Sequence, residues 1–142
     1  MVKITNMRPW KLINGWMTKE ETFKWKKILY ENIIWEQPIV KVFGKEYLVP
    51  RKTVFLGEYN ISYSYSGASH FAKGWPSWFY PLLDKVCNES ETKLNGCLLN
   101  LYKDGNDRMG WHCDNEKELD ISSPILSLSF GAARELFFKN RF

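Results

Sequence analysis

The sequence predicts an α+β fold in which antiparallel strands form a sandwich or a barrel. Helix signals fill much of the first part of the chain, and strand-like runs separated by short turns follow residue 95. A glycine-containing hairpin signal lies between two β-branched runs near residue 44. With 142 residues, of which 44% are hydrophobic, the chain has the size of one domain and enough apolar residues to form a core.

Composition excludes several classes of protein. No apolar run approaches the roughly 18 residues of a membrane-spanning helix, and the first residues lack the apolar core of a secretory signal. The three cysteines, Cys87, Cys97 and Cys113, are an odd number without the spacing of a disulfide framework, which favours a reducing compartment. We therefore expect a soluble, intracellular protein.

Charge is uneven along the chain. Residues 1–52 carry eleven Lys and Arg against five Glu, a net charge of +6, whereas residues 53–142 carry nine against eleven, a net charge of −2. A basic region of this kind suits a polyanionic partner such as nucleic acid. The alternative is a lysine-rich helix face that contacts only solvent.

The first elements follow from local signals. Thr18 and Glu21 have the spacing of a capping box, which predicts a helix that continues to about Glu31. Residues 38–50 contain two β-branched runs on either side of Phe43 and Gly44, which predicts a tight hairpin with Gly44 at positive φ.

The remaining elements are one more helix and a series of strands. Trp75-Pro76 predicts a helix to about residue 88, because proline suits the first helical turn. A polar turn is expected at 103–107, and an apolar strand at 135–142 would be left as a bare sheet edge, so we expect the sheet to be incomplete. The predicted strands are 59–67, 95–102, 109–114, 125–130 and 134–138.

Four polar residues near this turn suggest a site. His112 and Asp114 are two positions apart, so on an extended chain they share a face and can bind one cation, as in the two-histidine, one-carboxylate triad of iron oxygenases. An ordinary polar strand end is the alternative. Asn100 and Tyr102 have the same spacing before the turn, and a hairpin would bring all four together. Otherwise, Asn100 bonds a neighbouring turn and Tyr102 packs in the core with its hydroxyl outward.

Several blocks carry a family resemblance. NLYKDGNDRMGWHCDNE, SPILSLSFGAARELFF and PRKTVFLGEYNISYSYSG, together with the helix opened by Trp-Pro, resemble the AlkB family of Fe(II)/2-oxoglutarate dioxygenases, in particular the homologue 2 and 3 branch of DNA dealkylases. The similarity runs from about residue 39 to 138. It implies a double-stranded β-helix, or jelly-roll, that lacks its C-terminal side. The implied single domain has an N-terminal helix and a nucleotide-recognition lid in 1–70, and a helix and the first jelly-roll strands in 71–142.

The resemblance also implies roles for individual residues. His112 and Asp114 would bind Fe(II). Asn100 and Tyr102 would contact the cosubstrate 2-oxoglutarate, which is consumed together with O₂. The pocket for a flipped base would be lined by Tyr63, Tyr65, Ser66 and Glu116.

The hairpin resembles the DNA-probing finger of homologue 2. Phe43, beside Gly44, would fill the gap left by the extruded base, and Arg51 and Lys52 would hold backbone phosphates. From the residues alone, Phe43 can equally be an apolar hairpin tip packed on its own domain. Tyr63 and Tyr65 can equally be a stripe on the core face of a strand.

In the family, a second iron-binding histidine and an arginine for the 2-oxoglutarate carboxylate come after the position of Phe142. His70 precedes the His112–Asp114 pair, and we expect it in a loop on the lid side, where it does not replace that histidine. The implied function is oxidative demethylation of alkylated bases in duplex DNA, such as 1-methyladenine and 3-methylcytosine. The alternatives are a catalytically inactive nucleic-acid-binding remnant, or a dioxygenase that acts on RNA or protein.

Overall fold

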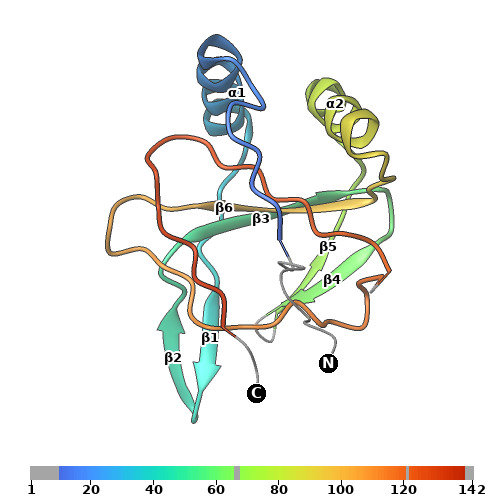
Figure 1. Cartoon of the computed structure of the whole chain (residues 1–142). Coiled ribbons are helices and arrows are strands. Elements are labelled where there is room, and N and C mark those ends of the chain that lie inside the picture. Colours follow the sequence, from blue (N-terminus) through green and yellow to red (C-terminus); the bar gives the residue numbers. More distant parts are fainter. Residues whose placement is uncertain (1–9, 66–67, 121, 140–142) are drawn as a thin grey trace, which may run out of the picture. The chain divides into compact units, whose positions relative to one another are not determined.

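The computed structural model describes residues 10–65, 68–120 and 122–139 (Figure 1). The chain divides into two compact units. One comprises Met1–Asn32 and Ser127–Phe142, and the other comprises Ile33–Leu126. Each unit is described by itself below.

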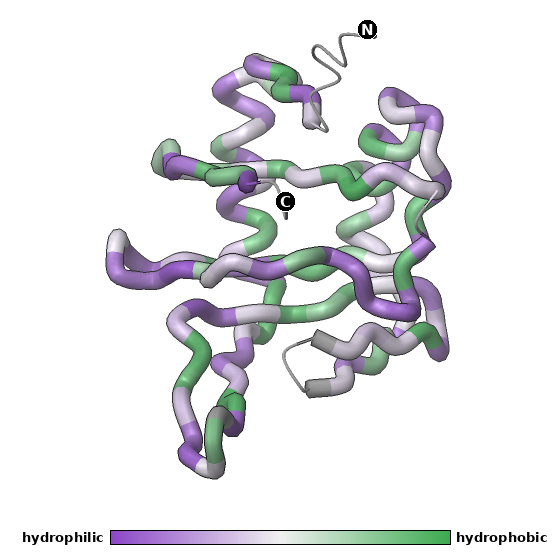
Figure 2. Tube along the Cα trace, turned by 60° about the horizontal axis from the view of Figure 1, so that its bottom comes forward, coloured by the Kyte–Doolittle hydropathy of each residue, from purple (hydrophilic) through white to green (hydrophobic). Residues whose placement is uncertain are grey.

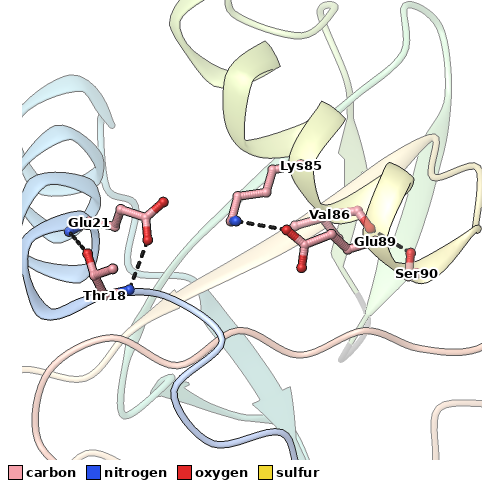
Figure 3. A network of polar contacts seen from close by, with 6 residues as sticks. All are labelled: Thr18, Glu21, Lys85, Val86, Glu89 and Ser90. Atoms are coloured by element: carbon pink, nitrogen blue, oxygen red, sulfur yellow. Dashed lines mark hydrogen bonds and ion pairs between the residues drawn. The ribbon is translucent and has the colours of Figure 1, made fainter.

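The first unit contains helix α1, Lys19–Asn32. Its N-terminus has the predicted capping box: the Thr18 N–H donates to Glu21 Oε2 at 2.8 Å, and the Glu21 N–H donates to Thr18 Oγ1 at 3.1 Å (Figure 3). These bonds satisfy backbone donors that the first helical turn leaves without partners. Trp25 is the buried residue of the helix, whereas Phe23 is exposed. The predicted helix is therefore confirmed.

In the second unit, strands β1, Ile39–Val42, and β2, Lys45–Leu48, form the predicted hairpin. Figure 1 shows it as an arm that extends away from strands β3 and β6, and Figure 2 shows apolar and polar positions along it. Its two-residue loop has φ of +49° at Phe43 and +76° at Gly44, and two positive φ values are what a type I′ turn requires. The positive φ of Phe43 was not predicted, and it is a strained conformation for a bulky residue.

The longest ladder pairs β3, Lys52–Gly57, with β6, Gly96–Leu101, in antiparallel register. A single bridge between Glu36 and Thr53 extends it on the other side of β3. The ladder requires glycine where the strands begin and end: a Cβ on Gly57 would lie 2.7 Å from the Asn95 carbonyl oxygen. Strand β6 was predicted. Strand β3 was not, because its partner lies more than forty residues along the chain.

A second hairpin pairs β4, Ser62–Tyr65, with β5, Ala68–Phe71. Strand β4 confirms the strand expected near 59–67, within shorter bounds. The expectation that His70 lies in a loop is wrong, because His70 belongs to β5 and faces Tyr63 in the register. Backbone pairing with β4 organises a segment whose polar, small residues gave no strand signal.

The predicted second helix is present but begins later. A 3-10 turn, η1, Ser77–Phe79, follows Pro76 and leads into α2, Tyr80–Ser90. The helix ends at Glu91, whose left-handed φ of +52° lets its N–H bond the Cys87 carbonyl. Lys85 and Glu89 form an ion pair at 2.8 Å on its surface (Figure 3).

Three predicted strands, 109–114, 125–130 and 134–138, are not strands in the part of the chain that the structure describes. A strand requires a neighbour that accepts and donates backbone hydrogen bonds. The described partner of β6 is β3, and residues 109–114 have no strand structure and form no ladder with β6. The described residues form three separate two-stranded ladders, and the jelly-roll stays a prediction.

The apolar core of the second unit is made by side chains from helix α2, the η1 turn, strand β4 and the segments between these elements. The aromatic rings of Trp75 and Phe79 stack with centroids 5.3 Å apart. In the residues described, no helix combines the length and apolarity needed to cross a membrane. The buried apolar residues are Ile33, Val49, Tyr63, Ala72, Phe79, Leu82 and Val86.

Candidate functional site

The imidazole of His112 and the carboxylate of Asp114 converge. His112 Nε2 lies 3.5 Å from Asp114 Oδ1, and both side chains are partly accessible, with 35% and 40% of their surfaces exposed. On its other side the ring is fixed by its own segment, because His112 Nδ1 lies 2.9 Å from the Gly110 carbonyl oxygen. A carbonyl only accepts hydrogen bonds, so this contact places the ring proton on Nδ1. The other ring nitrogen, Nε2, is the one that faces Asp114.

This pair suits a divalent cation. Two donor atoms that each lie about 2.1 Å from one ion are about 3.0 Å apart at a right angle and about 3.4 Å apart at a tetrahedral angle. The observed 3.5 Å is close to these values. Imidazole nitrogen with carboxylate oxygen is also the donor set of non-haem iron sites. Among the described residues no group of three or more His, Cys, Asp or Glu side chains could hold a metal ion, so the described site supplies two ligands.

Glu116 continues the alternation of His112 and Asp114. Its Oε2 atom is buried, and no described residue donates a hydrogen bond to it. A buried carboxylate oxygen without a donor is costly, since it has lost its water and gained nothing in return. Such an atom is a ready acceptor for a donor that a ligand brings.

A compact turn connects β6 to this segment. The Asp104 carboxylate accepts a hydrogen bond from the Asn106 backbone N–H at 2.8 Å, and this bond is the main cause that lowers the pKa of Asp104. Asp107 Oδ2 accepts from the Lys103 N–H at 2.7 Å. The predicted polar turn is therefore confirmed. After it, the Arg108 N–H donates to the Pro50 carbonyl at 2.9 Å, which fixes the path of the chain toward His112.

Asn100 lies in β6 opposite Thr53, and Tyr102 follows the end of that strand, half-buried. The Asn100 side chain is held by a residue that sequence reasoning assigned elsewhere: Arg51 Nε donates to Asn100 Oδ1 at 2.7 Å. This bond fits the alternative in which Asn100 bonds a neighbouring turn, because Arg51 lies in the bend between β2 and β3. Because 109–114 is not a strand beside β6, the expected hairpin is not formed, and a common pocket for the four residues stays a prediction.

Arg51 and Lys52 have opposite environments. Lys52 is exposed, whereas Arg51 is only 5% exposed. The expectation that Arg51 holds a DNA phosphate is therefore corrected, because its guanidinium is buried against Asn100. No local signal marks Arg51 for burial, because its partner lies forty-nine positions away in the sequence.

The residues expected to handle a base are only partly described. Tyr63 is 8% exposed and its ring stacks on Phe55 with centroids 5.5 Å apart, as the core-stripe alternative requires. Tyr65 pairs with Ala68 at the end of β4. Ser66 lies outside the described residues.

Phe43 lies at the tip of the β1–β2 hairpin. The Phe43 side chain is fully exposed, so the alternative in which the tip packs on its own domain is contradicted. Gly44 beside it is also exposed.

Comparisons with known proteins give consistent matches. The model of a family described as the 2OG-Fe(II) oxygenase superfamily matches residues 10–142. DNA oxidative demethylase ALKBH2 from Mus musculus is 41% identical over 102 residues, which cover 72% of this chain and 43% of that protein. ALKBH2 from Homo sapiens is 40% identical over 102 residues, with 72% and 39% covered.

A second type of relative also matches. Alpha-ketoglutarate-dependent dioxygenase alkB homolog 3 from Homo sapiens is 34% identical over 110 residues, which cover 75% of this chain and 37% of that protein. The matched region thus spans about two fifths of the length of these relatives. These matches confirm the resemblance to the AlkB homologue 2 and 3 branch.

Proposed function

We propose that this chain, which belongs to the 2OG-Fe(II) oxygenase superfamily, acts in the oxidative demethylation of alkylated bases in DNA, such as 1-methyladenine and 3-methylcytosine. The observation that carries the proposal is the approach of His112 Nε2 to Asp114 Oδ1 at 3.5 Å, with His112 Nδ1 held 2.9 Å from the Gly110 carbonyl oxygen. Relatives that share 40–41% of the aligned residues are named DNA oxidative demethylases.

In this proposal His112 and Asp114 hold Fe(II), and Asn100 and Tyr102 contact 2-oxoglutarate. When bound, iron with 2-oxoglutarate and O₂ supplies the oxidation that converts an N-methyl group to formaldehyde, with succinate and CO₂ as the other products. The chain's own residues would orient the N-methyl group of the base toward the metal, so that other positions of the base are not oxidised. The jelly-roll core in 71–142 and the lid in 1–70 are part of this proposal.

Glu116 would hold the base. Its buried Oε2 has no donor among the described residues. Adenine and cytosine each carry an exocyclic amino group, which donates hydrogen bonds and would satisfy this oxygen. Tyr65 and Ser66 would form the walls of the same pocket, where an extruded base needs aromatic faces to stack on.

The β1–β2 arm would probe the duplex. The exposed Phe43 ring at the tip has the shape and polarity to enter a base stack and fill the gap left by an extruded base. Gly44 permits the tight turn beside it. Lys52 is exposed and would contact a backbone phosphate. The proposed partner is duplex DNA, and we propose that the protein binds it as a monomer. Because the substrate is DNA, we propose a location in the nucleus if the organism is eukaryotic and in the cytoplasm otherwise.

The direct test measures formaldehyde released from a duplex that contains one 1-methyladenine, with Fe(II), 2-oxoglutarate and air. We expect release that requires 2-oxoglutarate and is lost in Asp114→Asn. The matched control is Asp84→Asn, which changes an aspartate of α2 outside the site. Binding of the duplex without formaldehyde release would contradict the enzyme and favour the inactive-remnant alternative. Equal activity on methylated RNA, or on protein alone, would contradict the DNA assignment.

The role of the arm is tested by Phe43→Ala. We expect activity on duplex substrate to fall while activity on a single-stranded substrate is retained, because only a stacked duplex needs a wedge. Tyr47→Ala is the matched control, since Tyr47 is also an exposed aromatic residue of the arm but lies away from the tip. Equal losses on both substrates would overturn the wedge role.

A further inference from the structure

We infer that Arg51 is a positioning residue for 2-oxoglutarate: it holds the Asn100 amide in the one orientation that presents an N–H donor to the cosubstrate. This inference rests on the proposed function, in which Asn100 contacts 2-oxoglutarate. Arg51 would thus affect cosubstrate binding through Asn100, without contacting the cosubstrate itself.

The geometry comes from the β3–β6 ladder. Arg51 directly precedes β3, and Asn100 lies near the end of β6. The register places Thr53 opposite Asn100, so the Arg51 side chain reaches Asn100 diagonally. Arg51 Nε donates to Asn100 Oδ1 at 2.7 Å, and only 5% of the arginine surface is exposed. Because burial removes competing water, a short bond from a charged donor is a strong constraint here.

The chemistry of the two groups fixes the orientation. A guanidinium has only donors, whereas a primary amide has one acceptor oxygen and one donor nitrogen. The oxygen of Asn100 must therefore face Arg51, since the flipped amide would place two donors against each other. The amide nitrogen is then directed away from Arg51, and no described residue accepts a hydrogen bond from it. The carboxylates and keto oxygen of 2-oxoglutarate are acceptors that suit this nitrogen.

The backbone around Arg51 connects the surroundings of Asn100 to the turn that leads to His112. The Arg51 N–H donates to the Val49 carbonyl at 2.8 Å, and the Pro50 carbonyl accepts the Arg108 N–H at 2.9 Å. Arg108 ends the turn that leads to His112. The segment from Val49 to Arg51 therefore makes two contacts. The Arg51 side chain holds the Asn100 amide, and the Pro50 carbonyl holds the backbone that leads to His112.

The test measures 2-oxoglutarate binding without turnover, in the full-length protein under anaerobic conditions with Mn²⁺ in place of iron. Arg51→Met keeps an unbranched apolar side chain as far as the position of Nε and removes the donor and the charge. We expect its Kd for 2-oxoglutarate to rise by about tenfold or more, because the Asn100 amide is no longer held in the orientation that presents its N–H to the cosubstrate. Arg51→Lys restores charge and a donor, so it should bind more tightly than Arg51→Met.

Thr53→Val is the matched control. Thr53 is 4% exposed and faces Asn100 in the ladder, so its replacement perturbs the same place without removing the bond to the amide. We expect its Kd to stay within about twofold of the wild-type value. The inference would be overturned if Arg51→Met bound 2-oxoglutarate with the wild-type Kd. It would also be overturned if Thr53→Val raised the Kd as much as Arg51→Met does.

Asn100→Asp keeps the inference testable if Arg51→Met does not fold. A carboxylate at position 100 still accepts from Arg51 Nε, so the ladder keeps its buried bond. The donor to 2-oxoglutarate is lost, and we expect the Kd to rise while the thermal midpoint is retained. Wild-type binding by Asn100→Asp would contradict the inference.

The two failures are distinguishable. A wild-type protein that binds Mn²⁺ but not 2-oxoglutarate would contradict the proposed function itself. A wild-type protein that binds 2-oxoglutarate as tightly as all Arg51 variants would contradict only the role of Arg51. In turnover assays, we expect Arg51→Lys to raise KM for 2-oxoglutarate more than it lowers kcat, as a positioning role requires.

Discussion

The β3–β6 ladder and the segment 109–116 hold their functional side chains in different ways. Asn100 sits in a paired strand, opposite the buried Thr53, and is bonded by a buried arginine. His112 and Asp114 sit in a segment without strand structure, where His112 is fixed by a carbonyl two residues away. Asn100, the proposed cosubstrate ligand, is thus positioned by pairing between strands that are distant in the sequence. His112 and Asp114, the proposed metal ligands, are positioned by contacts between residues that are close in the sequence.

This difference predicts different responses to mutation. A buried side chain in a ladder supports both the fold and the site, so its removal costs stability. An exposed side chain fixed by local contacts supports little besides its own position. Variants of 109–116 should therefore lose chemistry without losing stability, and variants around the ladder should lose stability first.

The largest effect is expected for His112→Ala. Demethylation should fall to the background of the assay, because the variant loses one of the two described metal ligands. The free energy of unfolding should change by no more than about 0.5 kcal/mol, since the residue is exposed. Formaldehyde release and urea denaturation measure the two quantities. His70→Ala, which changes the other histidine of this chain, should keep activity, and a loss equal to that of His112→Ala would contradict the assignment.

The next effect concerns the packing of β4 on the ladder. Tyr63→Ala should destabilise the protein by about 3 kcal/mol, because it removes a buried ring that stacks on Phe55. Tyr63→Phe keeps the ring, so its free energy of unfolding should stay within about 1 kcal/mol of the wild-type value. Urea denaturation of both variants measures the difference. A stable Tyr63→Ala would show that Tyr63 does not belong to the core.

A pH effect is expected from the ladder. Burial raises the pKa of the Cys97 thiol to about 11, whereas an unfolded cysteine titrates near about 8.5. The folded state therefore retains a proton that the unfolded state releases, so this contribution is fully present below about pH 8.5 and is lost as the pH rises toward the folded pKa. The loss should be on the order of 2 kcal/mol.

Cys97→Ala removes this titration. The difference in unfolding free energy between wild type and variant should shrink as the pH rises from about 8 to 10.5. Cys113→Ala is the control, because Cys113 is exposed and lies outside the ladder. A difference that does not depend on pH would contradict the burial of the thiol.

The smallest effect is expected at the turn between the two regions. The pKa of Asp104 is lowered, mainly by the hydrogen bond from the Asn106 backbone N–H. Its contribution to stability is present above the unfolded pKa of about 3.9 and is lost as the pH falls through the folded value. Asp104→Asn should lower the thermal midpoint slightly at pH 7 and have less effect at acidic pH. An effect that grows at acidic pH would contradict this account.

The sequence predicted the elements whose signals are local. The capping box of Thr18 and Glu21, the hairpin at Phe43 and Gly44 and the turn at 103–107 each depend on residues within a few positions of one another. The spacing of His112 and Asp114 likewise placed two donors together. These features need no knowledge of the tertiary fold.

Features that depend on distant partners were missed or misplaced. Strand β3 finds its partner in β6, and Arg51 finds Asn100 forty-nine positions away. A charged residue beside Lys52 gave no sign that it would be buried. Residues 125–130 and 134–138 have apolar strand patterns, but a pattern does not supply the neighbouring strand that backbone hydrogen bonds require.

The most direct test of the central claim is metal binding followed by NMR of the imidazole nitrogens. This chain has two histidines, so His70 in β5 serves as the internal control for His112. We predict that before metal is added the His112 ring is protonated on Nδ1, and that Mn²⁺ broadens its signals selectively while those of His70 stay sharp. Equal broadening of both rings, or selective broadening that persists in Asp114→Asn, would contradict a site formed by His112 and Asp114.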